Sequence, residues 1–168
     1  SIGFRANVTF DDVLVEGIEK IDKSDIQYAK DMGYTIKLLT VALRQENGIA
    51  LNVYPAFLPD NHPLSSVKGA YNAIYVTGNI VDDVMFYGRG AGALPTASAV
   101  MGDVISTAQH ILNGSTGTGM IMTDTKRIPF YSSLKLQNSY YFRLDVDDVT
   151  GVLSQIAAAF AENDISIC

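Results

Sequence analysis

The chain has 168 residues, of which 48% are apolar and 18% charged, a composition that is typical of a folded globular protein and excludes a disordered one. Its net charge of −6 argues against a nucleic-acid partner, because proteins that bind a phosphate backbone concentrate basic residues. The single cysteine, Cys168, excludes an internal disulfide and favours a reducing compartment, the cytoplasm. Ser1 at one end and the strand-like run Ile165 to Cys168 at the other predict that both ends lie within a longer protein.

A short strand and a helix are expected in the first part of the chain. Val13 to Val15 is an apolar run that favours a strand. Ser24 is a typical helix N-cap and predicts a helix over residues 25–32, with Asp25 near the positive end of its dipole. Gly33 follows at the position where a helix ends in a left-handed residue.

The next two β-type runs predict a hairpin. Tyr34 to Ala42 and Ile49 to Phe57 flank Asn47-Gly48, which is a strong turn signal. Pro55 indicates an edge or the exit of the second strand. Lys37 lies within the first strand, and we interpret it as a lysine on a solvent face, the alternative being a buried cation that serves a site.

His62 lies in a turn beside Pro63. It has no histidine, cysteine or paired carboxylate nearby at the spacing of metal ligands. A loop histidine packed beside a proline is therefore favoured over a catalytic or metal-binding one.

A second hairpin is expected from residues 71–77 and 80–87, joined at Gly78-Asn79. Asp82 and Asp83 interrupt its second strand. Adjacent residues on a strand point to opposite faces, which disfavours a shared metal ion and favours a solubilising role at a sheet edge.

Glycines alternate at Gly88, Gly90 and Gly92 between this strand and a helix expected from Pro95 or Thr96 to about Leu112. Such spacing removes side chains from one surface, and the helix start adds unpaired N–H groups with a partial positive charge. This surface can hold a phosphate or a flat ring, or it can be a tight turn without a ligand. The spacing matches neither the dinucleotide fingerprint nor the P-loop.

The helix after the glycines carries an apolar stripe that is expected to pack on the sheet. The stripe consists of Val100, Val104, Ala108 and Ile111, widened by Met101 and Ile105. His110 lies in the last turns of this helix, where a cation suits the dipole.

The last third of the chain begins with a Gly/Ser/Thr-rich break at residues 113–119, which indicates a linker. Tyr140 to Val146 alternates in the manner of a strand. A turn ending at Gly151 leads to a predicted helix that begins at Val152 and is ended by Asn163-Asp164, and Ile165 to Cys168 begins another strand.

Three passages, in order, resemble homoserine dehydrogenases. They are Val15 to Ile21 with Asp25 to Ala29 and Gly33 to Leu39, then Asn61 to Leu64 with Asn72 to Ile74, and then Tyr87 to Val104. Tyr141 to Val146, Thr150 to Leu153 and Ile156 resemble the start of an ACT domain. The resemblance implies a substrate-binding and dimerisation part at residues 1–113, a linker at 114–138 and an ACT-like part at 139–168. The expected fold class is α+β, with a mixed, largely antiparallel sheet of hairpins covered by helices, followed by an incomplete ACT-like βαβ piece.

The resemblance implies an oxidoreductase that interconverts L-homoserine and L-aspartate 4-semialdehyde with NAD(P), in threonine, methionine and isoleucine biosynthesis. The family handles the proton with an Asp and a Lys four residues apart, expected upstream of Ser1, and no Asp of this chain has a Lys four residues later. The resemblance places Gly92 at the nicotinamide, with Gly90 and Gly88 shaping the approach. The main cofactor domain is expected elsewhere, so the fragment alone is expected to be inactive.

A different class of function is a non-catalytic dimerisation or amino-acid-sensing module. The ACT-like tail supports it, with an effector such as threonine near Gly151, although a simple helix-start turn explains Gly151 equally well. For either function we expect a homodimer built through residues 34–87, because hairpin edges and apolar faces need a partner. No metal site and no membrane partner are expected.

Overall fold

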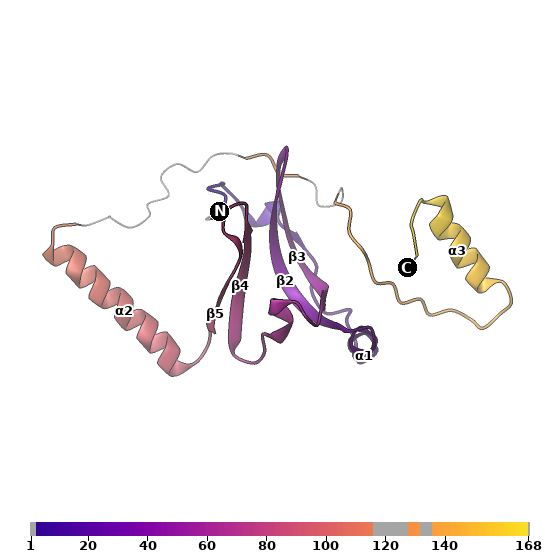
Figure 1. The fold of residues 1–168 in the computed structure, drawn as a ribbon, viewed down its shortest axis with the longest axis horizontal. Helices are drawn as coiled ribbons and strands as arrows, with labels where there is room; N and C mark the ends of the chain where they lie inside the picture. The colour runs from indigo at the N-terminus through magenta and orange to yellow at the C-terminus, as the bar shows by residue number, and fades with distance from the viewer. Residues whose placement is uncertain (1–2, 116–127, 132–135, 168) are drawn as a thin grey trace. The chain divides into compact units, whose positions relative to one another are not determined.

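The computed structural model describes residues 3–115, 128–131 and 136–167. It divides into two compact units, residues 1–136 and 137–168. The described residues form three α-helices and two small separate sheets, with no closed barrel among them, so the predicted α+β class is confirmed (Figure 1). Cys168 and most of the predicted linker lie outside the described residues.

The larger unit contains a three-stranded sheet. Its strands are β1 (Leu14–Val15), β2 (Tyr34–Gln45) and β3 (Gly48–Pro59), in the order β1-β3-β2. β2 and β3 pair antiparallel along their whole length and make the long hairpin in Figure 1. β1 pairs parallel to β3, and the amide of Glu16 extends this pairing to the carbonyl of Val53 at 2.7 Å.

The first predicted hairpin is confirmed, with its loop shifted by one residue. Gln45 pairs with Gly48, so Glu46 and Asn47 form the two-residue loop. Gly48 has a φ of 152°, and a Cβ there would lie against the carbonyl oxygen of Pro129. The strand start therefore requires glycine, because the later segment approaches its backbone too closely for a side chain.

That later segment extends the sheet by a short pairing. The amide of Ile49 donates to the Pro129 carbonyl at 3.0 Å, and the amide of Tyr131 donates to the Ile49 carbonyl at 2.8 Å. Among the described residues, Ile49 is the one large side chain that is fully buried. The small residues Ala6, Ala29 and Ala50 are buried as well. The core of this unit therefore includes the start of β3.

Pro55 lies in the middle of β3, paired with Leu38, and not at the exit of the strand. β1 pairs only with Asn52 and Val53. Beyond Val53, the side of β3 turned away from β2 is an edge in the described structure. A proline, which lacks the N–H donor, is tolerated at such a position.

Helix α1 (Lys23–Asp31) precedes β2, and its N-cap is Asp22, not the predicted Ser24. The Asp22 carboxylate accepts the amide of Ser24 at 2.7 Å, and the Asp25 carboxylate accepts the amide of Asp22 at 3.0 Å. The two aspartates thus form a reciprocal capping box. Gly33, with φ of 79°, follows the helix as predicted.

The second predicted hairpin is also confirmed, with a longer loop. Strands β4 (Tyr71–Gly78) and β5 (Asp82–Arg89) pair antiparallel, and residues 79–81 connect them. They form a separate two-stranded sheet, so the single mixed sheet expected from the sequence is replaced by two sheets. Two short 3-10 helices also belong to this unit: η1 (Phe10–Asp12) precedes β1, and η2 (Pro63–Ser66) lies between β3 and β4.

Helix α2 (Ala93–Leu112) begins two residues before the predicted start. Its apolar stripe does not pack on a sheet as expected: Val100, Val104 and Ile111 are 55%, 53% and 64% exposed. The stripe thus remains an apolar surface without cover in the described structure. His110 lies in the last turn, as predicted.

The smaller unit contains helix α3 (Val152–Glu162), which confirms the predicted helix. The strands expected at residues 140–146 and 165–167 are not formed. A strand needs a neighbour to satisfy its backbone donors and acceptors, and the described residues of this unit supply none. No helix in the described parts of the chain is long and apolar enough to cross a membrane.

The aspartate cap gives a first testable prediction. Replacing Asp22 by Ala removes the acceptor of two helix-start amides, so the free energy of unfolding should fall by about 1 kcal/mol. Ser24→Ala is the matched control and should change it by less than about 0.5 kcal/mol. Chemical denaturation measures both, and a larger effect at Ser24 than at Asp22 would contradict the cap assignment.

Candidate functional site

The glycine segment joins β5 to α2 and is exposed from Gly88 to Leu94. β5 ends at Arg89, and Gly90, Ala91 and Gly92 lead directly into the helix. The amide of Gly90 donates to the carbonyl of Ala70 at 3.2 Å, which ties the segment to the start of β4. The backbone surface inferred from the sequence is therefore open to a ligand.

The three glycines differ in how strongly the local structure requires them. Gly92 is the N-cap of α2 with φ of 126° and ψ of 146°, a conformation that residues with a side chain rarely adopt. A Cβ at Gly90 would overlap the side-chain amide of Asn72. Gly88 has open space around its missing Cβ, so nothing inside the described chain demands glycine there.

The start of α2 offers few but favourable donors. Its first intrahelical bond runs from the Thr96 amide to the Gly92 carbonyl at 3.1 Å. The amides of Ala93 and Leu94 precede this bond, while Pro95 has no N–H to offer. The first turn carries no acidic residue, so its partial positive charge is not offset there. This end of the hairpin suits an anionic, flat ligand.

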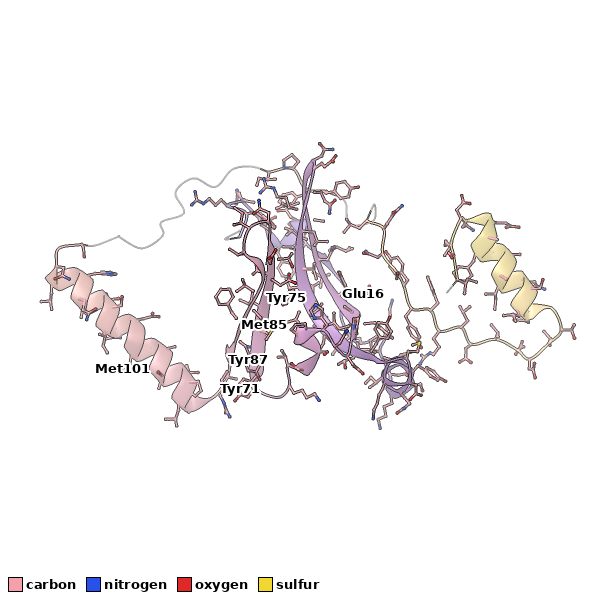
Figure 2. All side chains as sticks on the ribbon, viewed as in Figure 1. Glu16, Tyr71, Tyr75, Met85, Tyr87 and Met101 are labelled. Carbon is pink, nitrogen blue, oxygen red and sulfur yellow. The ribbon has the colours of Figure 1, made fainter. Side chains whose placement is uncertain are left out.

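Two tyrosines and an arginine, which the sequence analysis did not single out, lie beside the glycines. Tyr71 pairs with Arg89 across the hairpin, and the rings of Tyr71 and Tyr87 stack at 4.9 Å with an angle of 1°. Figure 2 shows both tyrosines at the same end of the hairpin. The sequence already indicated part of this arrangement, because Tyr87 and Arg89 are two residues apart on one strand and therefore share a face.

A second polar cluster spans the hairpin further from the glycines. The Thr77 hydroxyl donates to the Asp83 carboxylate at 2.7 Å, and the ring of His62 lies 5.0 Å from that of Tyr75. The hydrogen bonds from Thr77 and then Tyr75 hold the pKa of Asp83 below its ordinary value. The same contact with Asp83 raises the pKa of the Tyr75 hydroxyl. Asp83 thus links the two strands of the hairpin through its side chain, in addition to the solubilising role inferred for it.

His62 and Lys37 both have local partners. His62 caps η2, its Nδ1 accepting the amide of Leu64 at 3.2 Å. Lys37 is half-buried and donates to the carbonyl of Val67, so the solvent-facing interpretation is wrong. No group of metal-binding side chains occurs among the described residues.

Gly151, the position considered for an effector, is the N-cap of α3 with φ of 95°. This conformation explains the glycine without a ligand. It lies in the smaller unit.

The fold defines the chain as an α+β protein in which an exposed, glycine-rich segment joins a hairpin strand, β5, to a helix, α2. The sequence profile described as "Homoserine dehydrogenase" matches residues 1–105. The chain belongs to the homoserine dehydrogenase family.

Individual relatives agree with this assignment. The homoserine dehydrogenase of Corynebacterium glutamicum is 40% identical over 99% of this chain, and that of Bacillus subtilis is 38% identical over 98%. The crystal structure of a homoserine dehydrogenase from Thiobacillus denitrificans superposes with a TM-score of 0.83 at 33% identity, over 99% of this chain and 39% of that one. The chain spans 38% of the length of both curated relatives.

The Asp83 cluster gives a prediction for acid stability. Because its folded-state pKa is lowered, the carboxylate stabilises the fold above the unfolded value of about 3.9 and loses that contribution as the pH falls through the lowered pKa. Asp83→Asn should lower Tm at pH 7, and the gap to the wild type should begin to narrow below about pH 3.9 and close once the pH falls below the lowered folded-state pKa. Thermal melts across this range measure it, with Asp103→Asn on α2 as the control. A gap that is constant with pH would contradict the prediction.

Proposed function

We propose that this chain forms part of an NAD(P)-dependent homoserine dehydrogenase, which interconverts L-homoserine and L-aspartate 4-semialdehyde. The supporting observation is the exposed glycine segment at the start of α2, in a chain that belongs to this family. The reaction moves a hydride between the substrate carbon and the nicotinamide, and a proton between the hydroxyl and a base. Threonine, methionine and isoleucine biosynthesis would use this step.

In this proposal the chain supplies a supporting surface and not the proton-handling groups. Gly92, Gly90 and Gly88 would let the nicotinamide end of the cofactor approach bare backbone, and the start of α2 would favour its negative charge. The Asp and Lys that move the proton, and the main NAD(P)-binding domain, would come from other parts of the enzyme. The fragment alone would then be inactive, and the single cysteine supports a cytoplasmic location.

We do not favour the alternative of an amino-acid-sensing module that binds an effector such as threonine. An ACT-type site needs paired sheets, whereas the described part of the smaller unit has one helix and no strand. The local geometry of Gly151 is that of a helix start.

Gly88 offers the cleanest test of the proposed cofactor surface. Its missing Cβ has open space around it and its φ lies outside the left-handed region, so Gly88→Ala should fold normally. In the full-length enzyme the added methyl should raise the KM for NAD(P)H roughly tenfold, equivalent to about 1.4 kcal/mol of overpacking against the ligand.

Gly102→Ala is the matched control, because Gly102 is also exposed, with nothing near its missing Cβ. It should leave the KM for the cofactor unchanged. Gly92→Ala should weaken cofactor binding as well, but it also strains a backbone with φ of 126°, so it must be read together with its Tm. An unchanged KM in Gly88→Ala would count against a cofactor surface at this glycine.

We also propose that the enzyme is a homodimer built through residues 34–87. Support comes from one face of the β4–β5 hairpin, where Ile74 is 66% and Phe86 64% exposed. A contiguous apolar face of this kind favours burial against another surface.

A charge placed on this face should weaken the dimer. Phe86→Lys in the full-length enzyme should raise the dimer dissociation constant at least about 100-fold, because burying an unpaired charge costs about 3 kcal/mol or more. Leu112→Lys is the control, since Leu112 is also a large apolar residue, 85% exposed, but lies outside residues 34–87. Sedimentation equilibrium measures both, and a monomeric wild type at micromolar concentration would refute the proposal.

A further inference from the structure

Arg89 lies between Gly88 and Gly90, and its side chain rests on a stack of two aromatic rings. Its guanidinium carbon lies 5.2 Å from the centre of the Tyr71 ring, within the range of a cation–π contact. Tyr71 in turn stacks on Tyr87 with nearly parallel rings, 1° apart. The three side chains share one face of the β4–β5 hairpin, so the ladder fixes their order.

The charge around Arg89 is unusual for this chain. The protein as a whole carries a net charge of −6, yet Arg89 is the one charged residue between Asp83 and Asp103. The first turn of α2 adds its partial positive charge a few residues further on. Arg89 is exposed, and no described carboxylate neutralises it. An arginine whose side chain is pre-ordered on a ring, and whose donors are not already used, is well suited to bind a phosphate in a bidentate manner.

We propose that Arg89 binds the diphosphate of the nicotinamide dinucleotide and that Tyr71 is the positioning residue that holds it there. This inference rests on the proposed function, because it assumes that the cofactor lies on the glycine segment. The glycines would let the cofactor approach the backbone, and Arg89, one residue before Gly90, would fix the anionic part of the ligand. The aromatic stack reduces the side-chain entropy that an exposed arginine would otherwise lose on binding.

The test uses the full-length enzyme and titrates NADPH and NADH separately by their fluorescence, so that binding is measured without turnover. Arg89→Gln should weaken the binding of both by at least about tenfold, the loss expected for one charge-assisted contact. Arg89→Lys should recover part of this affinity, because it keeps the charge but loses the bidentate fork. The KM for homoserine should change by less than about twofold, because the contact is made with the cofactor.

Arg44→Gln is the matched control. Arg44 also lies over an aromatic ring, with its guanidinium carbon 6.0 Å from the centre of Phe4, but it belongs to the other sheet. Cofactor binding should be unchanged in this variant.

Two variants of Tyr71 test the positioning role. Tyr71→Phe keeps the ring and should bind the cofactor as the wild type does, whereas Tyr71→Leu removes the platform and should weaken binding about threefold to fivefold. The Tm of both variants should be measured alongside binding, because Tyr71 is half-buried and its replacement can change the stability of the fold.

The outcomes separate this inference from the proposed function. If the wild-type enzyme binds neither NADPH nor NADH, the proposed function fails. If the wild type binds and Arg89→Gln binds equally well, only the role of Arg89 is overturned. A rise in the homoserine KM without any loss of cofactor affinity also overturns it, because the arginine would then recognise the carboxylate of the substrate.

Discussion

The pairing of β3 with its neighbours is the interaction on which the larger unit depends. Twelve residues of β3 pair with twelve of β2, while β1 and residues 129–131 pair with parts of the same strand. Ile49 is buried at the point where the later segment joins. The backbone of Gly48 can meet the Pro129 carbonyl because it has no side chain. One strand therefore organises segments that are about 80 residues apart in the sequence.

The second hairpin depends less on burial and more on contacts along its own faces. Asp83 accepts the Thr77 hydroxyl at one end, and Tyr71 stacks on Tyr87 at the other. Between these contacts, its opposite face leaves Ile74 and Phe86 exposed. A two-stranded sheet of this kind is marginal by itself. Its stability in the full enzyme is therefore expected to come from surfaces that cover the apolar face.

The candidate site follows from how this hairpin ends. β5 delivers Arg89 and the glycines to the first turn of α2, and the Gly90 amide ties the junction to Ala70. The positive φ of Gly92 turns the chain into the helix without a side chain in the way. An exposed junction of bare backbone, one cation and a helix start is thus built from local contacts.

The sequence alone determined the local elements and the family. Both hairpins, helices α1, α2 and α3, and the glycine junction were predicted, because hydrophobic period, turn residues and caps act over a few neighbours. The cap of α1 at Asp22 is also local, since its partners are two and three residues away, but the prediction of Ser24 from the sequence was wrong. Only the tertiary structure decided that Lys37 bonds Val67 and that Tyr71 and Arg89 meet. It also decided that residues 140–146 form no strand and that the α2 stripe stays exposed. These outcomes depend on which distant segment packs or pairs with the residues concerned. The local sequence of a strand or of an apolar face does not select that segment by itself.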